Sequence, residues 1–204
     1  MKKIIDIASF WDNIYKNNSA GWDLKSPTPA FIDILNDKKI ISSGKLLILG
    51  SGYGYDAVEA AKAGLDVTGV DFSETATNYA KKLAASNGVK INFIKDNFFS
   101  LPESYSDYFD YAYDYVTICA INPDRREEYA AMLSSVLKCN GKFVALWFPV
   151  EDRPEGPPFG LNVQELTNIF TKYFELIVST DKVNSIKPRM GREFLQVYEK
   201  ICEG

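Results

Sequence analysis

The chain has 204 residues, of which 46% are hydrophobic and 25% charged, and a formal net charge of -4. These values are ordinary for a soluble globular protein and suffice for one α/β domain with a substantial core. The acidic balance argues against a nucleic-acid partner, because phosphate binding favours a basic face. No apolar run approaches the roughly 20 residues that span a membrane, so we expect no membrane partner either.

The cysteine and histidine counts limit the chemistry. The cysteines are Cys119, Cys139 and Cys202, and histidine is absent. An odd number of widely spaced cysteines without a C-x-x-C motif predicts reduced thiols, a cytoplasmic protein and no metal site. The N-terminus meets Asp6 too early for an export signal. Without imidazole, the commonest general base is missing.

Hydrophobic periodicity predicts helices alternating with strands. The predicted helices cover residues 9–17, with Ser9 as a possible N-cap, then 30–35 behind Pro27 and Pro29, 55–63, 75–86, 123–137 and 163–173. The predicted strands cover residues 45–49, 66–70, 90–94, 109–118 and 142–148, and an antiparallel pair covers 174–183 and 193–200. This alternation predicts a doubly wound, Rossmann-like α/β sheet that is mostly parallel, with helices on both faces.

Residues 50–54 read Gly-Ser-Gly-Tyr-Gly and follow the first apolar strand. Glycines at a strand-to-helix turn let the backbone approach a ligand closely. Asp71, at the tip of the second strand, can accept hydrogen bonds from both hydroxyls of a ribose, which completes a nucleotide-binding βαβ unit. The third glycine is Gly54 rather than residue 55, so the motif resembles motif I of S-adenosylmethionine (SAM) methyltransferases more than a dinucleotide fingerprint. A plain glycine-rich turn, with Asp71 as a turn residue or helix cap, is the alternative.

Residues 149–160, of sequence PVEDRPEGPPFG, are too rich in proline for regular structure. They follow the fifth predicted strand, at the carboxyl edge of the sheet where ligands bind in open α/β folds. The segment is either a lid or substrate loop, or a plain connector. Arg153 within it either draws in anions or forms a surface ion pair.

Five segments together resemble the thiopurine S-methyltransferase family, which includes bacterial thiol methyltransferases and plant halide/thiol methyltransferases. They read FWDNIYKNNSAGWDLKSPTPAF, GSGYGYD, VTGVDFS, AINPDRREEYA and FPVEDRPEGPPFGLNVQEL, and they run from about Phe10 to about Phe194. The resemblance implies a seven-stranded class I SAM-dependent methyltransferase with an antiparallel C-terminal strand and with S-adenosylhomocysteine (SAH) as product. It also implies one domain over residues 1–204, with residues 1–40 as a helical cap over the cofactor.

The resemblance assigns cofactor contacts to ten positions. Asp71 would bind the ribose, Phe72 would pack on the adenine, and the segment that begins at Asp96 would read the adenine edge. Aromatic residues of the N-terminal cap would cover SAM, and the last position lies near the end of the fourth strand. The ten positions are Trp11, Tyr15, Trp22, Gly50, Asp71, Phe72, Asp96, Asn97, Phe98 and Tyr115.

Each assignment has a structural alternative. Trp11, Tyr15 and Trp22 could be core aromatics, since positions 11 and 15 are one helical turn apart. Asp96 could cap a short helix over residues 97–100, and Tyr115 could be a buried strand tyrosine. Cys119, near the end of the fourth strand, suits a buried inert thiol better than a nucleophile.

The resemblance implies methylation of a small, soft acceptor: a thiol, bisulfide, a halide, a selenium or tellurium species, or a thiopurine. Tyr115 is typical of the halide/thiol branch, whereas mammalian thiopurine enzymes carry arginine there, so we expect acceptors other than thiopurines. Such acceptors are largely anionic near neutral pH and fit a chain without histidine, so we assign no catalytic residue. The family also implies a monomer. An NAD(P)-dependent oxidoreductase or a non-catalytic SAM-binding protein remains the alternative.

Overall fold

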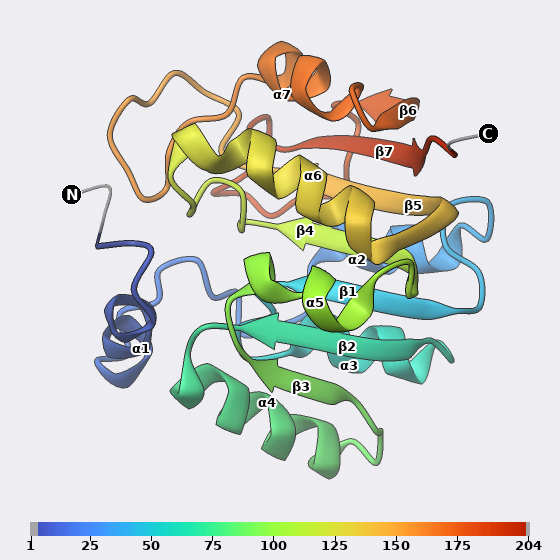
Figure 1. Cartoon of the computed structure of the whole chain (residues 1–204). Coiled ribbons are helices and arrows are strands. Elements are labelled where there is room, and N and C mark those ends of the chain that lie inside the picture. Colours follow the sequence, from blue (N-terminus) through green and yellow to red (C-terminus); the bar gives the residue numbers. More distant parts are fainter. Residues whose placement is uncertain (1–3, 203–204) are drawn as a thin grey trace.

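A single sheet organises the computed structural model, which describes residues 4–202 (Figure 1). Its strands lie in the order β3-β2-β1-β4-β5-β7-β6. Neighbouring strands pair in parallel, except that β7 is antiparallel to both β5 and β6. The strands are β1 Lys45–Leu49, β2 Asp66–Asp71, β3 Asn92–Lys95, β4 Phe109–Tyr115, β5 Leu137–Trp147, β6 Phe174–Thr180 and β7 Phe194–Lys200. This topology confirms the predicted seven-stranded, mostly parallel α/β sheet with its antiparallel C-terminal pair.

The helices lie on both faces of the sheet, with α5 and α6 in front and α2 and α3 behind in Figure 1. They are α1 Ala8–Lys16, α2 Pro29–Asn36, α3 Tyr55–Lys62, α4 Glu74–Ser86, α5 Pro102–Tyr105, α6 Arg126–Val136 and α7 Val163–Phe170, with 3-10 turns η1 Phe98–Ser100 and η2 Pro123–Arg125. Within the described residues, no helix has both the length and the apolar character needed to cross a membrane.

The central strand β1 shows why both faces need cover. Leu46 and Ile48 belong to a buried cluster with residues of α2, α3 and α4, whereas Leu47 and Leu49 belong to a second cluster with residues of α6 and α7. Successive strand side chains point to opposite faces, so an unbroken apolar run requires helices on both. Burying each leucine contributes about 1.5–3 kcal/mol.

The ends of several elements differ from their sequence-based limits. Ser9 does not cap α1, because the helix begins at Ala8 with Ile7 at its N-cap and no side-chain cap. Strand β5 begins at Leu137, five positions before the predicted 142. Strand β4 ends at Tyr115 rather than at residue 118, because the chain turns sharply at Val116, where φ is 60°. Short helices such as α5 carry no periodic signal and were not expected.

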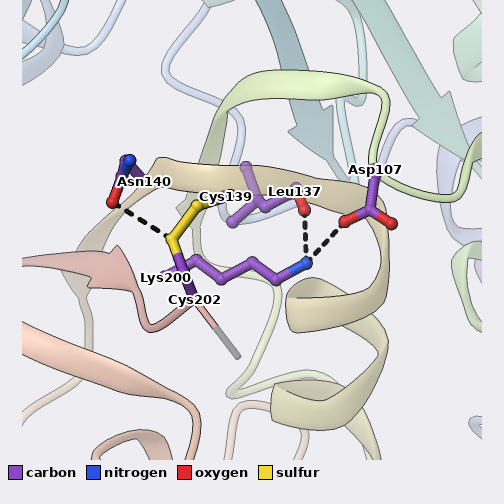
Figure 2. The surroundings of a disulfide bond; sticks show 6 residues. All are labelled: Asp107, Leu137, Cys139, Asn140, Lys200 and Cys202. Carbon is purple, nitrogen blue, oxygen red and sulfur yellow. Dashed lines mark hydrogen bonds and ion pairs between the residues drawn. A yellow bond between two sulfur atoms is a disulfide. The ribbon is translucent and has the colours of Figure 1, made fainter. Parts of the chain in front are cut away.

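Two of the three cysteines depart from the prediction of reduced thiols. Cys139, at the start of β5, and Cys202, just after β7, form a disulfide that closes a separation of 63 residues (Figure 2). Beside it, the Lys200 ammonium donates hydrogen bonds to the Asp107 carboxylate at 2.7 Å and to the Leu137 carbonyl at 2.8 Å. Antiparallel pairing of β7 with β5 brings the two cysteines together, and sequence spacing does not reveal that pairing. A cytoplasmic location, which rested partly on reduced thiols, stays a prediction.

Candidate functional site

A cavity of about 590 Å³ lies at the carboxyl edge of the parallel strands. The turns after β1, β2 and β4 form its floor. Residues of α1, of the loop after β5 and of the segment before β7 also line it. Figure 1 shows α1 and the orange loop after β5 on the side to which the arrowheads of β2 and β4 point. The cavity therefore sits where ligands bind in open α/β folds.

The glycine turn forms part of the cavity floor. Gly50 has a φ of 55°, and a Cβ added there would lie 2.5 Å from Thr117 Oγ1 on the neighbouring strand end. Gly54 has a φ of 81°, and its added Cβ would lie 2.9 Å from Ala80 in α4. Glycine is required at both positions by backbone conformation and by close packing. The turn thus brings bare backbone against the cavity, as the sequence motif predicts.

Asp71 joins the glycine turn to the tip of β2. Its carboxylate accepts hydrogen bonds from the Gly52 amide at 2.8 Å and from the Ser73 amide at 2.8 Å. The side chain is 7% exposed, and burial raises the pKa of Asp71 to about 6. The N-cap of α4 is Ser73, not Asp71. A carboxylate offers about four acceptor positions, so this one can still accept hydrogen bonds from ligand hydroxyls.

The predicted adenine-side residues divide into two groups. Phe72 and Phe98 both line the cavity, with ring centroids 6.4 Å apart. Asp96 and Asn97 lie outside the cavity lining. Asp96 is exposed and accepts a hydrogen bond from the Asn97 amide at 2.7 Å. The cap of η1 is Asn97, whose Oδ1 accepts from the Phe99 amide at 3.0 Å, rather than Asp96.

Aromatic side chains from the N-terminal segment form one wall of the cavity. The Trp22 indole N–H donates to the Tyr15 hydroxyl at 3.1 Å, and the two rings meet edge to face at 5.6 Å. Trp11 packs on Trp22 at 5.7 Å. Asp12 fixes α1 to the start of α4 by accepting from the Ser73 hydroxyl at 2.7 Å. These aromatics pack on one another and also line the cavity, so the core and cofactor-cap interpretations coexist.

A buried polar cluster joins Tyr115, the last residue of β4, to the segment just before β7. The Tyr115 hydroxyl donates a hydrogen bond to the Glu193 carboxylate and accepts one from the Arg189 guanidinium. Arg189 also donates to the Trp22 carbonyl at 2.6 Å, which ties the N-terminal segment to the turn that precedes β7. Arg189 and Glu193 are 5% and 4% exposed. Tyr115 is thus both a buried strand tyrosine and a cavity residue. Burial raises its pKa.

Arg189 and Glu193 were missed because no motif surrounds them. The signal available was weak: two arginines and a glutamate just before the last strand. Their partner Tyr115 lies more than 70 residues away. Pairing between elements so far apart depends on the strand order, which places β4, β5 and β7 side by side.

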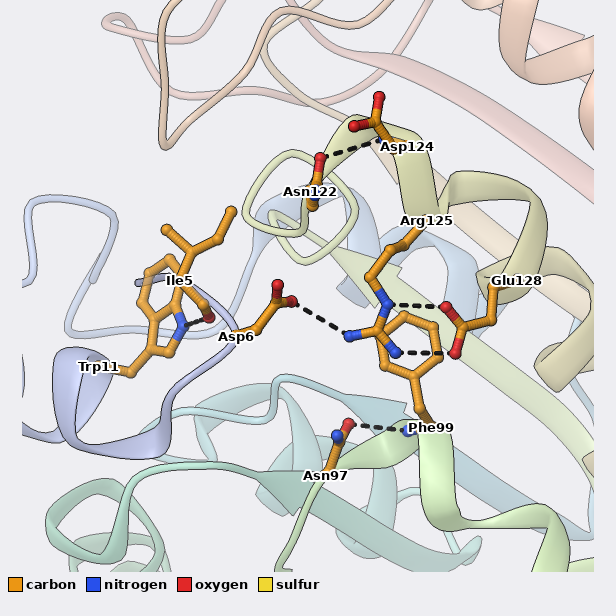
Figure 3. A network of polar contacts seen from close by, with 9 residues as sticks. All are labelled: Ile5, Asp6, Trp11, Asn97, Phe99, Asn122, Asp124, Arg125 and Glu128. Carbon is orange, nitrogen blue, oxygen red and sulfur yellow. Dashed lines mark hydrogen bonds and ion pairs between the residues drawn. The ribbon is translucent and has the colours of Figure 1, made fainter. Parts of the chain in front are cut away.

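Arg125 forms a second network at the cavity rim (Figure 3). Its guanidinium donates two hydrogen bonds of 2.7 Å to Glu128 and one of 3.1 Å to Asp6. It also stacks over the Phe99 ring, 3.7 Å from the centroid. The segment that carries Asp6 is held further by the Trp11 indole, which donates to the Ile5 carbonyl at 2.7 Å. Arg125 therefore connects η2 to the N-terminal segment, and both Arg125 and Asp6 line the cavity.

The proline-rich loop contributes Pro157 and Pro158 to the cavity lining. The Phe159 amide anchors it by donating to the Cys119 carbonyl at 2.7 Å. Arg153 pairs with Glu151 at 3.7 Å and does not line the cavity, which favours the surface ion-pair interpretation. Cys119 lines the cavity but is 2% exposed, and burial raises the pKa of its thiol.

Eight of the ten predicted cofactor positions line the cavity, all except Asp96 and Asn97. The residues present fit SAM: bare backbone at the glycine turn, a carboxylate beside it, and aromatic rings above. Ring faces stabilise a sulfonium charge as they do other cations. A carboxylate and several aromatic rings in the lining of one cavity suit a ligand with a ribose and a cationic centre. The individual contacts stay predictions.

Comparisons with known proteins point the same way. The model of the thiopurine S-methyltransferase family matches residues 7–200. The chain is 30% identical to probable thiol methyltransferase 2 of Arabidopsis thaliana, over 93% of this chain and 84% of that protein. It is 29% identical to thiocyanate methyltransferase 1 of Brassica oleracea, over 94% and 84%. The crystal structure of Burkholderia thailandensis 1,6-didemethyltoxoflavin-N1-methyltransferase with bound SAH has the same fold, with a TM-score of 0.75, 21% identity, and coverage of 96% of this chain and 87% of that one.

Proposed function

The chain belongs to the thiopurine S-methyltransferase family and is a SAM-dependent methyltransferase, and on this basis we propose that its acceptor is a small, soft anion such as a thiolate, bisulfide or a halide. The observation that carries this proposal is the buried arginine at the cavity wall. Arg189 is 5% exposed and donates to two uncharged oxygens, those of the Tyr115 hydroxyl and the Trp22 carbonyl. The Glu193 carboxylate balances this charge only through the intervening Tyr115 hydroxyl, so in this proposal the guanidinium keeps an attraction for an anion in the cavity.

The residues around the cavity suggest how the two halves of SAM would be held. Asp71 would accept hydrogen bonds from the ribose hydroxyls, and Phe72 with Phe98 would contact the adenine on the β2–β3 side. Tyr15 and Trp22 would then face the sulfonium. In this proposal residues 1–204 form one domain, with residues 1–40 as the cap.

When bound, SAM supplies a methyl group that is already activated, so the protein mainly has to align the acceptor with it and exclude water. The site is poorly suited to removing a proton from the acceptor. Among the described residues, Tyr115 and Cys119 line the cavity near the end of β4 and are candidates for a general base. Burial raises the pKa of both side chains above their usual range. An acceptor that arrives ionised needs no base. This favours bisulfide, halides and acidic thiols over weakly acidic alkyl thiols.

The relatives support the same acceptor class, because three of them are named as thiol or thiocyanate methyltransferases. Membership of the family also decides between a methyltransferase and the oxidoreductase considered from the sequence. A thiopurine acceptor would be larger and is the second candidate, supported by bacterial relatives named as thiopurine S-methyltransferases at 25% identity.

The test is release of SAH from SAM with bisulfide, iodide, thiocyanate, 2-mercaptoethanol and 6-mercaptopurine, each tested alone. We expect the highest kcat/KM with bisulfide or a halide. Arg189→Met should raise KM for these anions, while Arg189→Lys, which keeps the charge, should recover part of the loss. A preference for 6-mercaptopurine, or an anion KM that Arg189→Met leaves unchanged, would contradict the proposed acceptor class.

A further inference from the structure

Val116 has an unusual backbone conformation at the end of β4. Its φ is 60°, and among the non-glycine residues of 4–202 with positive φ it is the only β-branched one. A branched side chain rarely adopts this left-handed region, because Cβ then crowds the backbone. Such outliers persist where the surrounding structure fixes them, and they concentrate at ligand sites.

The surrounding contacts hold this turn from both sides. The Asp114 carboxylate accepts hydrogen bonds from the Thr117 amide at 3.0 Å, from the Ile118 amide at 3.2 Å and from the Tyr129 hydroxyl at 2.8 Å. The Thr117 hydroxyl donates to the Leu49 carbonyl at 2.9 Å. The residues that flank Val116 are therefore bonded on both sides of the strained position. The turn cannot relax without breaking several buried hydrogen bonds.

Val116 borders the cavity on the side away from Asp71. Tyr115 and Thr117 on either side of it are buried, whereas Val116 is half-buried and lines the cavity. In the sheet, β1 separates β4 from β2, the strand that carries Asp71. A ribose at Asp71 with its adenine toward Phe72 leaves the β4 side for the acceptor, next to Arg189.

We propose that Val116 is a specificity-determining residue whose strained turn forms a rigid floor of the acceptor compartment and limits the size of the acceptor. This inference rests on the proposed function. Valine is stiff at χ1, and its side chain also packs on both hydrophobic clusters of the core, so this floor cannot move aside for a larger ligand. A smaller residue at position 116 should admit larger thiols.

The test compares Val116→Ala, Val116→Gly and Val116→Thr with the wild type. The readout is the ratio of kcat/KM for 1-butanethiol to kcat/KM for bisulfide, with SAH affinity measured by calorimetry. We expect Val116→Ala to raise the ratio roughly tenfold, the usual scale for one or two methyl groups in an apolar pocket. Val116→Thr keeps the shape and should stay near the wild-type ratio. SAH affinity should stay within about twofold, since Val116 lies away from the ribose side.

Stability gives a second readout that does not depend on turnover. Glycine adopts a φ of 60° without strain, whereas alanine keeps the crowded Cβ. We therefore expect Val116→Gly to unfold at a higher urea concentration than Val116→Ala, although glycine buries fewer atoms. If Val116→Ala unfolds at the higher urea concentration, the proposal that the turn at Val116 is strained is overturned. If Val116→Ala does not fold, Val116→Gly supplies the activity ratio, with the same rise expected.

The outcomes separate this inference from the proposed function. If the wild type binds SAH and methylates bisulfide, but the ratio is unchanged in both small variants, the role of Val116 is overturned and the proposed function stands. If the wild type releases SAH with none of the anionic acceptors, the proposed function fails and the role of Val116 fails with it.

Discussion

The Gly52 amide donates a 2.8 Å hydrogen bond to the Asp71 carboxylate, so the glycine turn and the tip of β2 form one unit. Nineteen residues separate the two partners. The bond fixes the carboxylate at the cavity floor, where its remaining lone pairs can accept ligand hydroxyls. A substitution at Gly52 or at Asp71 should therefore disturb the position of the other residue as well, and so weaken cofactor binding.

Asp71→Ala should weaken SAH binding about 100-fold, because two hydrogen bonds to a charged acceptor contribute about 1.5–3 kcal/mol each and water compensates part of the loss. Calorimetric titration with SAH measures this. Asp66→Ala, at the exposed start of the same strand, is the matched control and should bind SAH like the wild type. Equal affinity in Asp71→Ala and wild type would remove Asp71 from the cofactor site.

SAH binding should also depend on pH through Asp71. Burial raises the pKa of Asp71 from 3.8 to about 6. A carboxyl whose folded pKa is raised stabilises the fold most below the unfolded pKa of 3.8, and this contribution is lost as the pH rises through 6. The ionised carboxylate is the form that accepts hydrogen bonds from the ligand hydroxyls. SAH affinity should therefore be highest above pH 6 and should fall below it, whereas the contribution of Asp71 to folding stability changes in the opposite direction.

Calorimetry with SAH between about pH 5 and pH 8 checks this, because affinity should fall by at most about tenfold per pH unit on the acid side. In Asp71→Ala the acid-side fall should disappear. If it persists, another buried carboxyl titrates instead, either Asp56, which lines the cavity, or Asp114, since burial raises the pKa of both to about 6.

Asp6→Asn should speed SAH dissociation by about two- to fivefold. The Arg125–Asp6 pair spans the cavity rim at 3.1 Å, and its side chains are 26% and 33% exposed. A partly exposed pair of this kind contributes about 0.5–1 kcal/mol. Stopped-flow displacement of bound SAH measures the rate, which in the wild type should also rise with salt.

Glu127→Gln is the control for this effect. Glu127 pairs with Lys172 at 2.7 Å on the surface of α6 and does not line the cavity. Its loss should leave the dissociation rate and its salt dependence unchanged. If both variants dissociate SAH like the wild type, the N-terminal segment is not held closed by Arg125.

Reduction of the Cys139–Cys202 disulfide should lower the free energy of unfolding by about 2–4 kcal/mol, because the bond restricts the unfolded chain. Urea unfolding with and without dithiothreitol measures the change, and Cys139→Ser should show the reduced value under both conditions. The bond joins the start of β5 to the end of β7, at the edge of the sheet opposite the cavity, so SAH affinity should not change. Equal stability with and without dithiothreitol would contradict the cross-link.

The secondary structure followed closely from local patterns. The strand at β1 was predicted at its observed limits, and the helix α4 was predicted within one residue, with Ser73 as its observed cap. Apolar runs, glycine turns and caps act within a few residues, so they can be recognised along the chain. Strand β4 ended early because the Asp114 carboxylate holds the following amides in a turn, and that contact requires the folded chain.

The sequence by itself determined the class of fold, the glycine turn with Asp71, and the family, because these depend on local periodicity and on short motifs. Only the tertiary structure decided which distant residues meet. Arg125 and Asp6 lie 119 residues apart, Tyr115 and Glu193 lie 78 apart, and the bonded cysteines lie 63 apart. It also placed Asp96 and Asn97 outside the cavity. Strand order and loop packing set these contacts, and no local pattern of residues encodes them.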